Sequence, residues 1–178
     1  MTMAPRDNLG QSKARLIGPD EIGSLTVAFP FPRPDVAVLE RNESLFRYLL
    51  ACPIVPIELY SWERWPYKRG YFALARAPGQ ARLVDLWNSS DDPDDWRALV
   101  QCAVHQARLQ PGAAEIIAWA SDPLLCGVLR QCGFHAGATL PIQLLGRAGT
   151  NLPQSGLRVQ MIDNDAAYLH EGGAHPLA

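Results

Sequence analysis

The sequence lacks the features by which several classes of protein are recognised. No apolar run approaches the roughly 18 residues that a membrane span requires, and residues 1–10 contain no apolar stretch typical of a secretory signal. The four cysteines, Cys52, Cys102, Cys126 and Cys132, form no CxxC pair. We therefore expect a cytoplasmic protein without membrane contact, whose cysteines are small buried side chains in a reducing compartment.

Motifs for metal binding, nucleophilic catalysis and nucleic-acid binding are also missing. No HxxxH or HxH spacing occurs, which argues against a metal site, and there is no GxSxG elbow. The largest basic cluster is Lys68-Arg69, whereas a nucleic-acid-binding face needs a concentrated basic patch. The run Asp163-Asn164-Asp165 lacks the glycine and glutamate of a calcium loop, and we expect a solvated turn there.

What is present is the composition of one ordinary globular domain. The chain has 178 residues, of which 48% are hydrophobic and 19% charged, with a net charge of −2. Prolines are frequent in residues 1–40, where a Phe-Pro-Phe-Pro-Arg-Pro stretch excludes a helix or a central strand. We expect a partly disordered segment at 1–40 with an edge strand near 25–29, the domain at 41–170, and a flexible tail at 171–178.

Periodicity predicts an α/β (α+β) fold with a mixed, mostly antiparallel central sheet flanked by helices. Asn42 is placed to cap a helix that buries Phe46 and Leu49, and Pro78-Gly79 is placed to turn an antiparallel hairpin. Apolar residues from Trp96 onward recur at helical spacing, and Asp122 precedes a second such helix. Strands are expected at 54–60, 70–76, 81–87, 114–120, 138–145 and 157–162.

Residues 70–134 resemble the core of the GNAT family of N-acetyltransferases. The resemblance rests on Gly70-Tyr71-Phe72-Ala73-Leu74, on Ala81-Arg82-Leu83-Val84-Asp85-Leu86-Trp87, and on the helix that ends in Gly133-Phe134. It implies that two central strands, at 81–88 and 114–120, splay apart and hold the pantetheine arm of an acyl-CoA between them. An amine would then attack the thioester directly.

The resemblance also implies a set of cofactor contacts. The loop 88–95 would lie at the pyrophosphate, on the N-terminus of the long helix, where free N–H groups and the helix dipole favour anions. We expect Trp87, Asn88, Ser89 and Ser90 to contact acetyl-CoA or another acyl-CoA, and Ser121 to line the opposite wall.

The sequence departs from the family pattern at two places. The loop has no glycine and no basic residue but four aspartates, Asp91, Asp92, Asp94 and Asp95, which would compete with a diphosphate for the N–H groups. Where the family often has a tyrosine that protonates the leaving thiolate, this chain has Leu129. Candidates for that role are Tyr71, Tyr168 and Ser121.

Asp85 is the candidate general base, because it interrupts an apolar strand and would share a face with Leu83 and Trp87. A carboxylate on an apolar face has a raised pKa, which suits proton abstraction from an ammonium group. The alternative interpretation is that Asp85 pairs with an arginine.

Two functions follow from these observations. The first is acyl transfer from an acyl-CoA to an amine or hydroxyl of a small molecule or sugar, with Asp85 as base. The second is a degenerate GNAT-like binding or assembly module that does not turn over CoA. Since residues 1–40 lack a convincing early strand and helices, we also expect a homodimer that supplies the missing wall.

Overall fold

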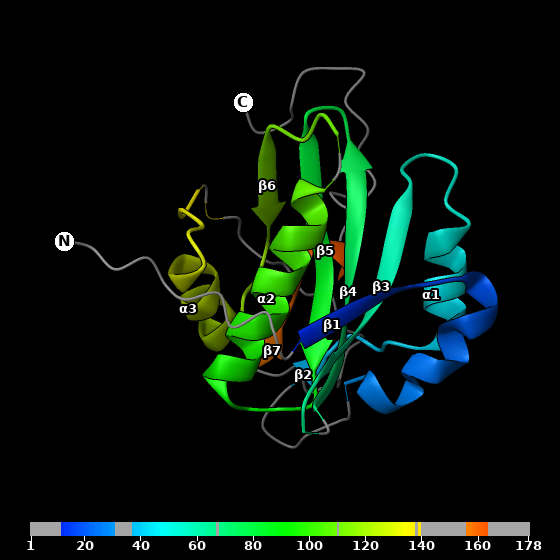
Figure 1. Cartoon of the computed structure of the whole chain (residues 1–178), viewed down its shortest axis with the longest axis horizontal. Helices are drawn as coiled ribbons and strands as arrows, with labels where there is room; N and C mark the ends of the chain where they lie inside the picture. The colour runs from blue at the N-terminus through cyan, green and yellow to red at the C-terminus, as the bar shows by residue number, and fades with distance from the viewer. Residues whose placement is uncertain are drawn as a thin grey trace, which may run out of the picture.

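A five-stranded mixed sheet forms the centre of the chain in the computed structural model (Figure 1). The structure describes residues 12–30, 37–66, 68–109, 111–137, 139 and 156–163. The strand order is β1-β3-β4-β5-β6, with β1 (Ser12–Ile17), β3 (Ile57–Arg64), β4 (Lys68–Ala77), β5 (Gln80–Asn88) and β6 (Glu115–Ala118). Neighbours pair antiparallel from β1 to β5, and β5 pairs parallel to β6.

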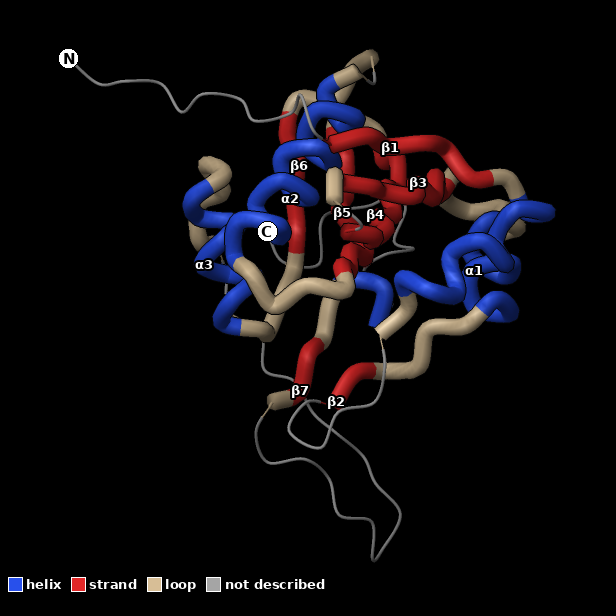
Figure 2. The backbone as a smooth tube through the Cα atoms, turned by 60° about the horizontal axis from the view of Figure 1, so that its bottom comes forward, coloured by secondary structure: helices blue, strands red, loops and turns tan. Residues whose placement is uncertain are grey.

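Helices cover both faces of this sheet. Figure 2 shows α2 (Pro93–Arg108) and α3 (Pro123–Gln131) on one side, and α1 (Glu43–Leu50) on the other. A 3-10 helix, η2 (Pro19–Ala28), packs with α1. The expected α+β fold with a mixed, mostly antiparallel sheet is therefore confirmed.

A second, very small sheet joins two distant parts of the sequence. Strand β2 (Ala37–Val38) pairs parallel with β7 (Leu157–Arg158), and the two lie side by side in Figure 2. A 3-10 turn, η3 (Met161–Asp163), follows β7. Residues 156–163, called the inserted segment below, thereby return the chain to the middle of the molecule.

The sequence signals at the element ends have the expected local effects. The side chain of Asn42 accepts a hydrogen bond from the Leu45 amide at 2.9 Å, and that of Asp122 accepts one from the Leu125 amide at 3.1 Å. Gly79 turns the β4–β5 hairpin with φ 75°, and Gly133 ends α3 with φ 92°. These left-handed conformations suit glycine at both positions.

The N-terminal region differs from the expectation. The segment 25–29 was expected as an edge strand, but residues up to Ala28 belong to η2, and the edge strand of the sheet is β1. The frequent prolines predict a partly disordered, irregular segment at 1–40, whereas pairing with β3 makes Ser12–Ile17 a strand. Residues 1–11 and the expected strand at 138–145, apart from Thr139, lie outside the described residues, as do the tail and Tyr168.

Within the described residues, no helix is long and apolar enough to cross a membrane.

The core beneath the helices contains large side chains that are almost completely buried, among them Trp62, Trp96, Tyr71, Phe46 and Phe72. Tyr71 and Phe46 meet edge to face, with ring centroids 5.2 Å apart. This packing holds the Tyr71 side chain of β4 in place beside the candidate site.

Candidate functional site

The pairing between strands β5 and β6 ends halfway along β5. They pair only from Gln80 to Leu83 on one side and from Glu115 to Ala118 on the other, whereas β5 continues to Asn88. The C-terminal half of β5, from Val84 to Asn88, therefore has β4 as a neighbouring strand on one side but does not pair with β6 on the other. The resemblance implied such a gap between these two strands.

A β-bulge lies where the gap opens. In the β4–β5 register, Ala73 is opposite Asp85 but its neighbour Leu74 is opposite Leu83, which leaves Val84 as the extra residue. Because adjacent residues of β4 face opposite sides of the sheet, Asp85 and Leu83 also face opposite sides. The expectation that they share a face is wrong, since a bulge breaks the two-residue alternation.

The inserted segment occupies the gap. Gln160 bridges to Ala120, and the Ser121 amide donates to the Val159 carbonyl at 3.0 Å. The side-chain amide of Gln160 then accepts a hydrogen bond from the Leu86 amide at 3.0 Å and donates one to the Leu86 carbonyl at 2.8 Å. Gln160 is 7% exposed, so one buried side chain takes the place of a neighbouring strand at Leu86.

Arg41 fastens the inserted segment to β5 through two carboxylates. Its Nε and Nη2 donate to Asp85 at 2.9 and 3.1 Å, and its Nη1 and Nη2 reach Asp163 at 2.7 and 3.0 Å. Nη1 also donates to the Leu39 carbonyl at 2.9 Å. All five donors of the guanidinium are thus used, in a cluster whose side chains are 0–3% exposed.

Burial and charge shift the titration of this cluster. Complete burial raises the pKa of Asp85 and outweighs the nearby Arg41 cation, and the Asp163 carboxylate acts in the same direction. The hydroxyl of Tyr71 donates to Asp85 at 2.8 Å. Burial, and secondly the Asp85 charge, raise the pKa of Tyr71 well above its ordinary value. The arginine partner that the alternative interpretation required for Asp85 is Arg41.

The amides at the N-terminus of α2 are bonded within their own loop. The Ser90 amide donates to Asn88 Oδ1 at 2.7 Å, the Asp92 amide to Ser90 Oγ at 3.2 Å, and the Asp94 amide to Asp92 Oδ1 at 2.9 Å. Each of these N–H groups is one that a phosphate at this position would use. Side-chain oxygens of the loop therefore accept the hydrogen bonds that a bound anion would otherwise accept.

Two of the remaining predicted cofactor residues, Ser121 and Trp87, contact the inserted segment. Ser121 Oγ donates to the Leu157 carbonyl at 2.7 Å and accepts from the Val159 amide at 2.8 Å. The Arg158 guanidinium lies 5.1 Å from the centre of the Trp87 ring. Asn88 is 2% exposed, and its Nδ2 has no hydrogen-bond partner within the described part of the chain. Ser89 is exposed, and its amide donates to the Arg69 carbonyl at 3.1 Å.

Sequence reasoning missed the three residues that organise this centre, Arg41, Gln160 and Asp163. Asp163 was expected in a solvated turn, but its side chain is only 3% exposed because it is bound to Arg41. Arg41 directly precedes the capping residue Asn42, and its position in the sequence gives no sign of carboxylate partners 44 and 122 residues further along the chain.

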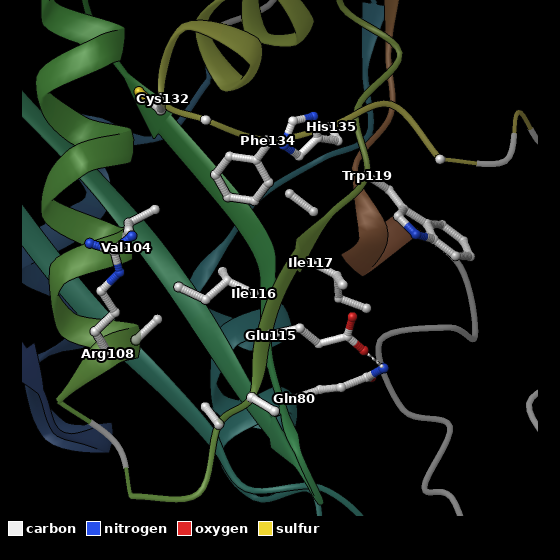
Figure 3. Close-up of a pocket in the computed structure, with 16 residues that line it drawn as sticks. Gln80, Val104, Arg108, Glu115, Ile116, Ile117, Trp119, Cys132, Phe134 and His135 are labelled. Atoms are coloured by element: carbon white, nitrogen blue, oxygen red, sulfur yellow. Dashed lines mark hydrogen bonds between the residues drawn. The ribbon is translucent and has the colours of Figure 1, made fainter.

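A cavity of about 780 Å³ lies elsewhere, beside β6 (Figure 3). In Figure 3, Val104 and Arg108 of α2 and Phe134 surround Ile116, and Glu115 is hydrogen bonded to Gln80. None of the predicted catalytic or cofactor residues lines it. The described residues contain no group of three or more His, Cys, Asp or Glu side chains placed to hold a metal ion.

Comparison with protein-family models, curated proteins and solved structures gave no match to this chain. The features that bear on its function are therefore the contacts of Asp85, Leu86 and the inserted segment.

Proposed function

We propose that this chain is a non-catalytic binding or assembly module with a GNAT-like sheet, which does not turn over CoA. The observation that carries this proposal is the pair of hydrogen bonds between the Gln160 side chain and both backbone groups of Leu86. A pantetheine arm in the gap would need the backbone groups that Gln160 holds. The residues present in the gap do not fit an acyl-CoA.

The charge of the loop supports the same proposal. Asp91, Asp92 and Asp94 are exposed around the start of α2, and the nearby amides are bonded within the loop. Two like charges ~4 Å apart repel by about 1 kcal/mol in water and more where solvent is excluded. A diphosphate at this position would meet these carboxylates and find few N–H donors to offset the repulsion.

The surroundings of Asp85 also argue against a catalytic base. Asp85 is 0% exposed, and its two carboxylate oxygens accept hydrogen bonds from Arg41 and Tyr71. A general base must come within hydrogen-bond distance of the proton that it removes. No substrate amine reaches Asp85 while these contacts are intact.

Acyl transfer from acyl-CoA to a small-molecule acceptor is the second candidate function. It is favoured by the separation of β5 from β6 beyond Leu83 and by the buried Nδ2 donor of Asn88, which has no hydrogen-bond partner among the residues that the structure describes. Asp85 would be its catalytic residue, and Trp87, Asn88, Ser89, Ser90 and Ser121 would contact the cofactor. These roles remain predictions.

Calorimetric titration with acetyl-CoA separates the two candidates. We expect no binding heat for the native chain, because the gap and the loop amides are occupied. A variant with Asp91, Asp92, Asp94 and Asp95 changed to Asn keeps side-chain acceptors for the capping bonds and removes the charge, so any binding that appears only there measures the repulsion. Micromolar binding by the native chain, with acyl transfer that Asp85→Asn abolishes, would overturn the non-catalytic proposal.

A further inference from the structure

The cavity beside β6 is built from elements other than the inserted segment. Its walls come mainly from the C-terminal half of α2, from β6 and the residues next to it, and from the residues that follow α3 (Figure 3). Ala107, Ala113 and Ala114 are among the lining residues, so little side-chain volume fills the space there. At about 780 Å³ the cavity has the size of a small-molecule site, for which ~300–1,000 Å³ is usual.

The two faces of β6 separate the acidic and the apolar lining of this cavity. Successive residues of a strand point to opposite faces, and in Figure 3 Ile116 projects toward α2 whereas Glu115 projects from the other face. Glu115 is the only carboxylate among the described lining residues, and it is hydrogen bonded to the Gln80 side chain. The space between α2 and β6, called the α2 side below, is therefore bordered by apolar side chains and the Arg108 guanidinium.

Arg108 brings a positive charge to the α2 side without a counter-ion. Its guanidinium forms no hydrogen bond or ion pair with any residue that the structure describes, whereas Arg41, Arg64, Arg76 and Arg97 each pair with a carboxylate. The planar fork of guanidinium donors matches the two oxygens of a carboxylate. The cavity therefore offers a carboxylate a partner that no side chain of the described residues already occupies.

We propose that the α2 side of this cavity binds a small amphipathic carboxylate, whose hydrocarbon chain packs against Val104, Ile116 and Phe134 and whose oxygens accept hydrogen bonds from Arg108. The charge of Arg108 selects an anion. The three apolar side chains are half-buried at the edge of the core, and covering them favours a ligand with a hydrocarbon chain over an inorganic anion. Binding there is independent of the proposed function, because no residue of the inserted segment lines the cavity.

An NMR titration of the native chain compares octanoate with octanamide, a neutral probe of the same chain length. We expect octanoate to shift the backbone amide signals of Ile116 and Phe134 and to bind at least about tenfold more tightly than octanamide, because only octanoate carries a charge that pairs with Arg108. The comparison uses the native chain alone, so it does not depend on a variant that folds. Equal affinity for the two probes, or octanoate shifts confined to other residues, would overturn the proposal.

The variant Arg108→Gln removes the charge and keeps a polar side chain at the same place. Octanoate should bind this variant at least ~10-fold more weakly than the native chain, whereas the affinity for octanamide should change by less than about twofold. Arg130→Gln is the matched control, because Arg130 is an exposed basic residue in the last turn of α3 that does not line the cavity. A loss of octanoate affinity in both variants alike, or in neither, would refute the ion pair at Arg108 and with it the proposal.

The apolar walls are tested by the length of the probe. Affinity should rise from butyrate through hexanoate to octanoate by about two- to fourfold for each added methylene group, and equal affinities would contradict a hydrocarbon chain in the cavity. Dilution of the protein alone should leave the Ile116 and Phe134 signals unchanged, since shifts on dilution would mean that a second copy of the chain covers the cavity instead. Failure of octanoate to bind leaves the proposed lack of CoA turnover untouched, whereas acetyl-CoA binding by the native chain refutes the proposed function and not this site.

Discussion

Arg41 is the only cation within contact of two buried carboxylates among the described residues. Its replacement by methionine would leave Asp85 and Asp163 buried without their partner. Removing one member of a buried ion pair usually costs about 3–5 kcal/mol. We predict a loss of that size in the free energy of unfolding of Arg41→Met, measured by urea denaturation with tryptophan fluorescence.

Arg47 provides the control for this substitution. It pairs with Glu43 at 3.5 Å on the surface of α1, and both side chains are about half exposed. Exposed pairs contribute ~0–1 kcal/mol, so Arg47→Met should change the free energy of unfolding little. Equal losses in the two variants would show that the buried cluster is no more important to stability than a surface pair.

The raised pKa of Asp85 gives the stability a defined pH dependence. Because burial raises the pKa above its ordinary value of 3.8, the folded chain holds this proton more tightly than the unfolded chain does. Stability contributed by protonated Asp85 is therefore complete at low pH and is lost as pH rises through the raised pKa. Arg41 and Tyr71 are the titratable groups that contact Asp85, and Asp163 acts on it through its charge.

The measurement is the difference in unfolding free energy between the native chain and Asp85→Asn. We predict that the native value minus the variant value becomes smaller as pH rises from about 4 to about 7. Other groups titrate equally in both proteins and largely cancel. A difference that grows with pH would mean that the Arg41 attraction outweighs desolvation and lowers the pKa.

At the scale of elements, Gly70 determines how closely β4 and β5 approach at the end of β5. A Cβ at Gly70 would lie 2.4 Å from the Trp87 carbonyl oxygen and 3.0 Å from Asn88 Cβ. Backbone must shift to make room, so we predict that Gly70→Ala destabilises the fold by about 1–3 kcal/mol in thermal or urea unfolding.

Gly127 is the matched glycine. It lies inside α3, and an added Cβ would meet no atom within 4 Å. Alanine should stabilise this helix by up to ~1 kcal/mol. If both alanine variants change stability in the same direction, steric crowding at the β4–β5 end does not account for the effect of Gly70→Ala.

Elements whose residues specify them locally could be predicted from the sequence. The capping side chains Asn42 and Asp122 and the turn glycines Gly79 and Gly133 all act within a few residues, and they occur where expected. Strand β1 could not be predicted, because its alternation is weak and its pairing with β3 joins residues more than forty positions apart. Tertiary contact, not propensity, makes it a strand.

The candidate site could be predicted only where its signal is local in the sequence. Asp85 interrupts the apolar run from Leu83 to Trp87, which is a local signal. Its partner Arg41 is 44 positions earlier, and Gln160 is 74 positions after Leu86. No spacing rule connects such positions, and the bulge at Val84 that turns Asp85 toward Tyr71 is not marked by any glycine.

At the scale of the whole molecule, the expected homodimer remains a prediction. It rested on residues 1–40 lacking an early strand and helix, but β1 and η2 lie there. The remaining ground is the open edge of β1, where Leu16 is 54% exposed and the strand pairs only with β3 in the described sheet. Light scattering after size-exclusion chromatography should give twice the mass of one chain, and a monomer at tens of micromolar would remove this prediction.

The long reach of the inserted segment has a consequence for biosynthesis. Arg41, Asp85 and Leu86 leave the ribosome well before Gln160 and Asp163 are translated, so the nascent sheet lacks the Asp163 partner of Arg41 and the Gln160 partner of both Leu86 backbone groups. The final assembly of the centre is therefore a late event that depends on distant contacts and their loop-closure entropy. Nascent chains halted before position 160 should be more easily cleaved by proteases than released chains, even though every strand of the main sheet has been synthesised.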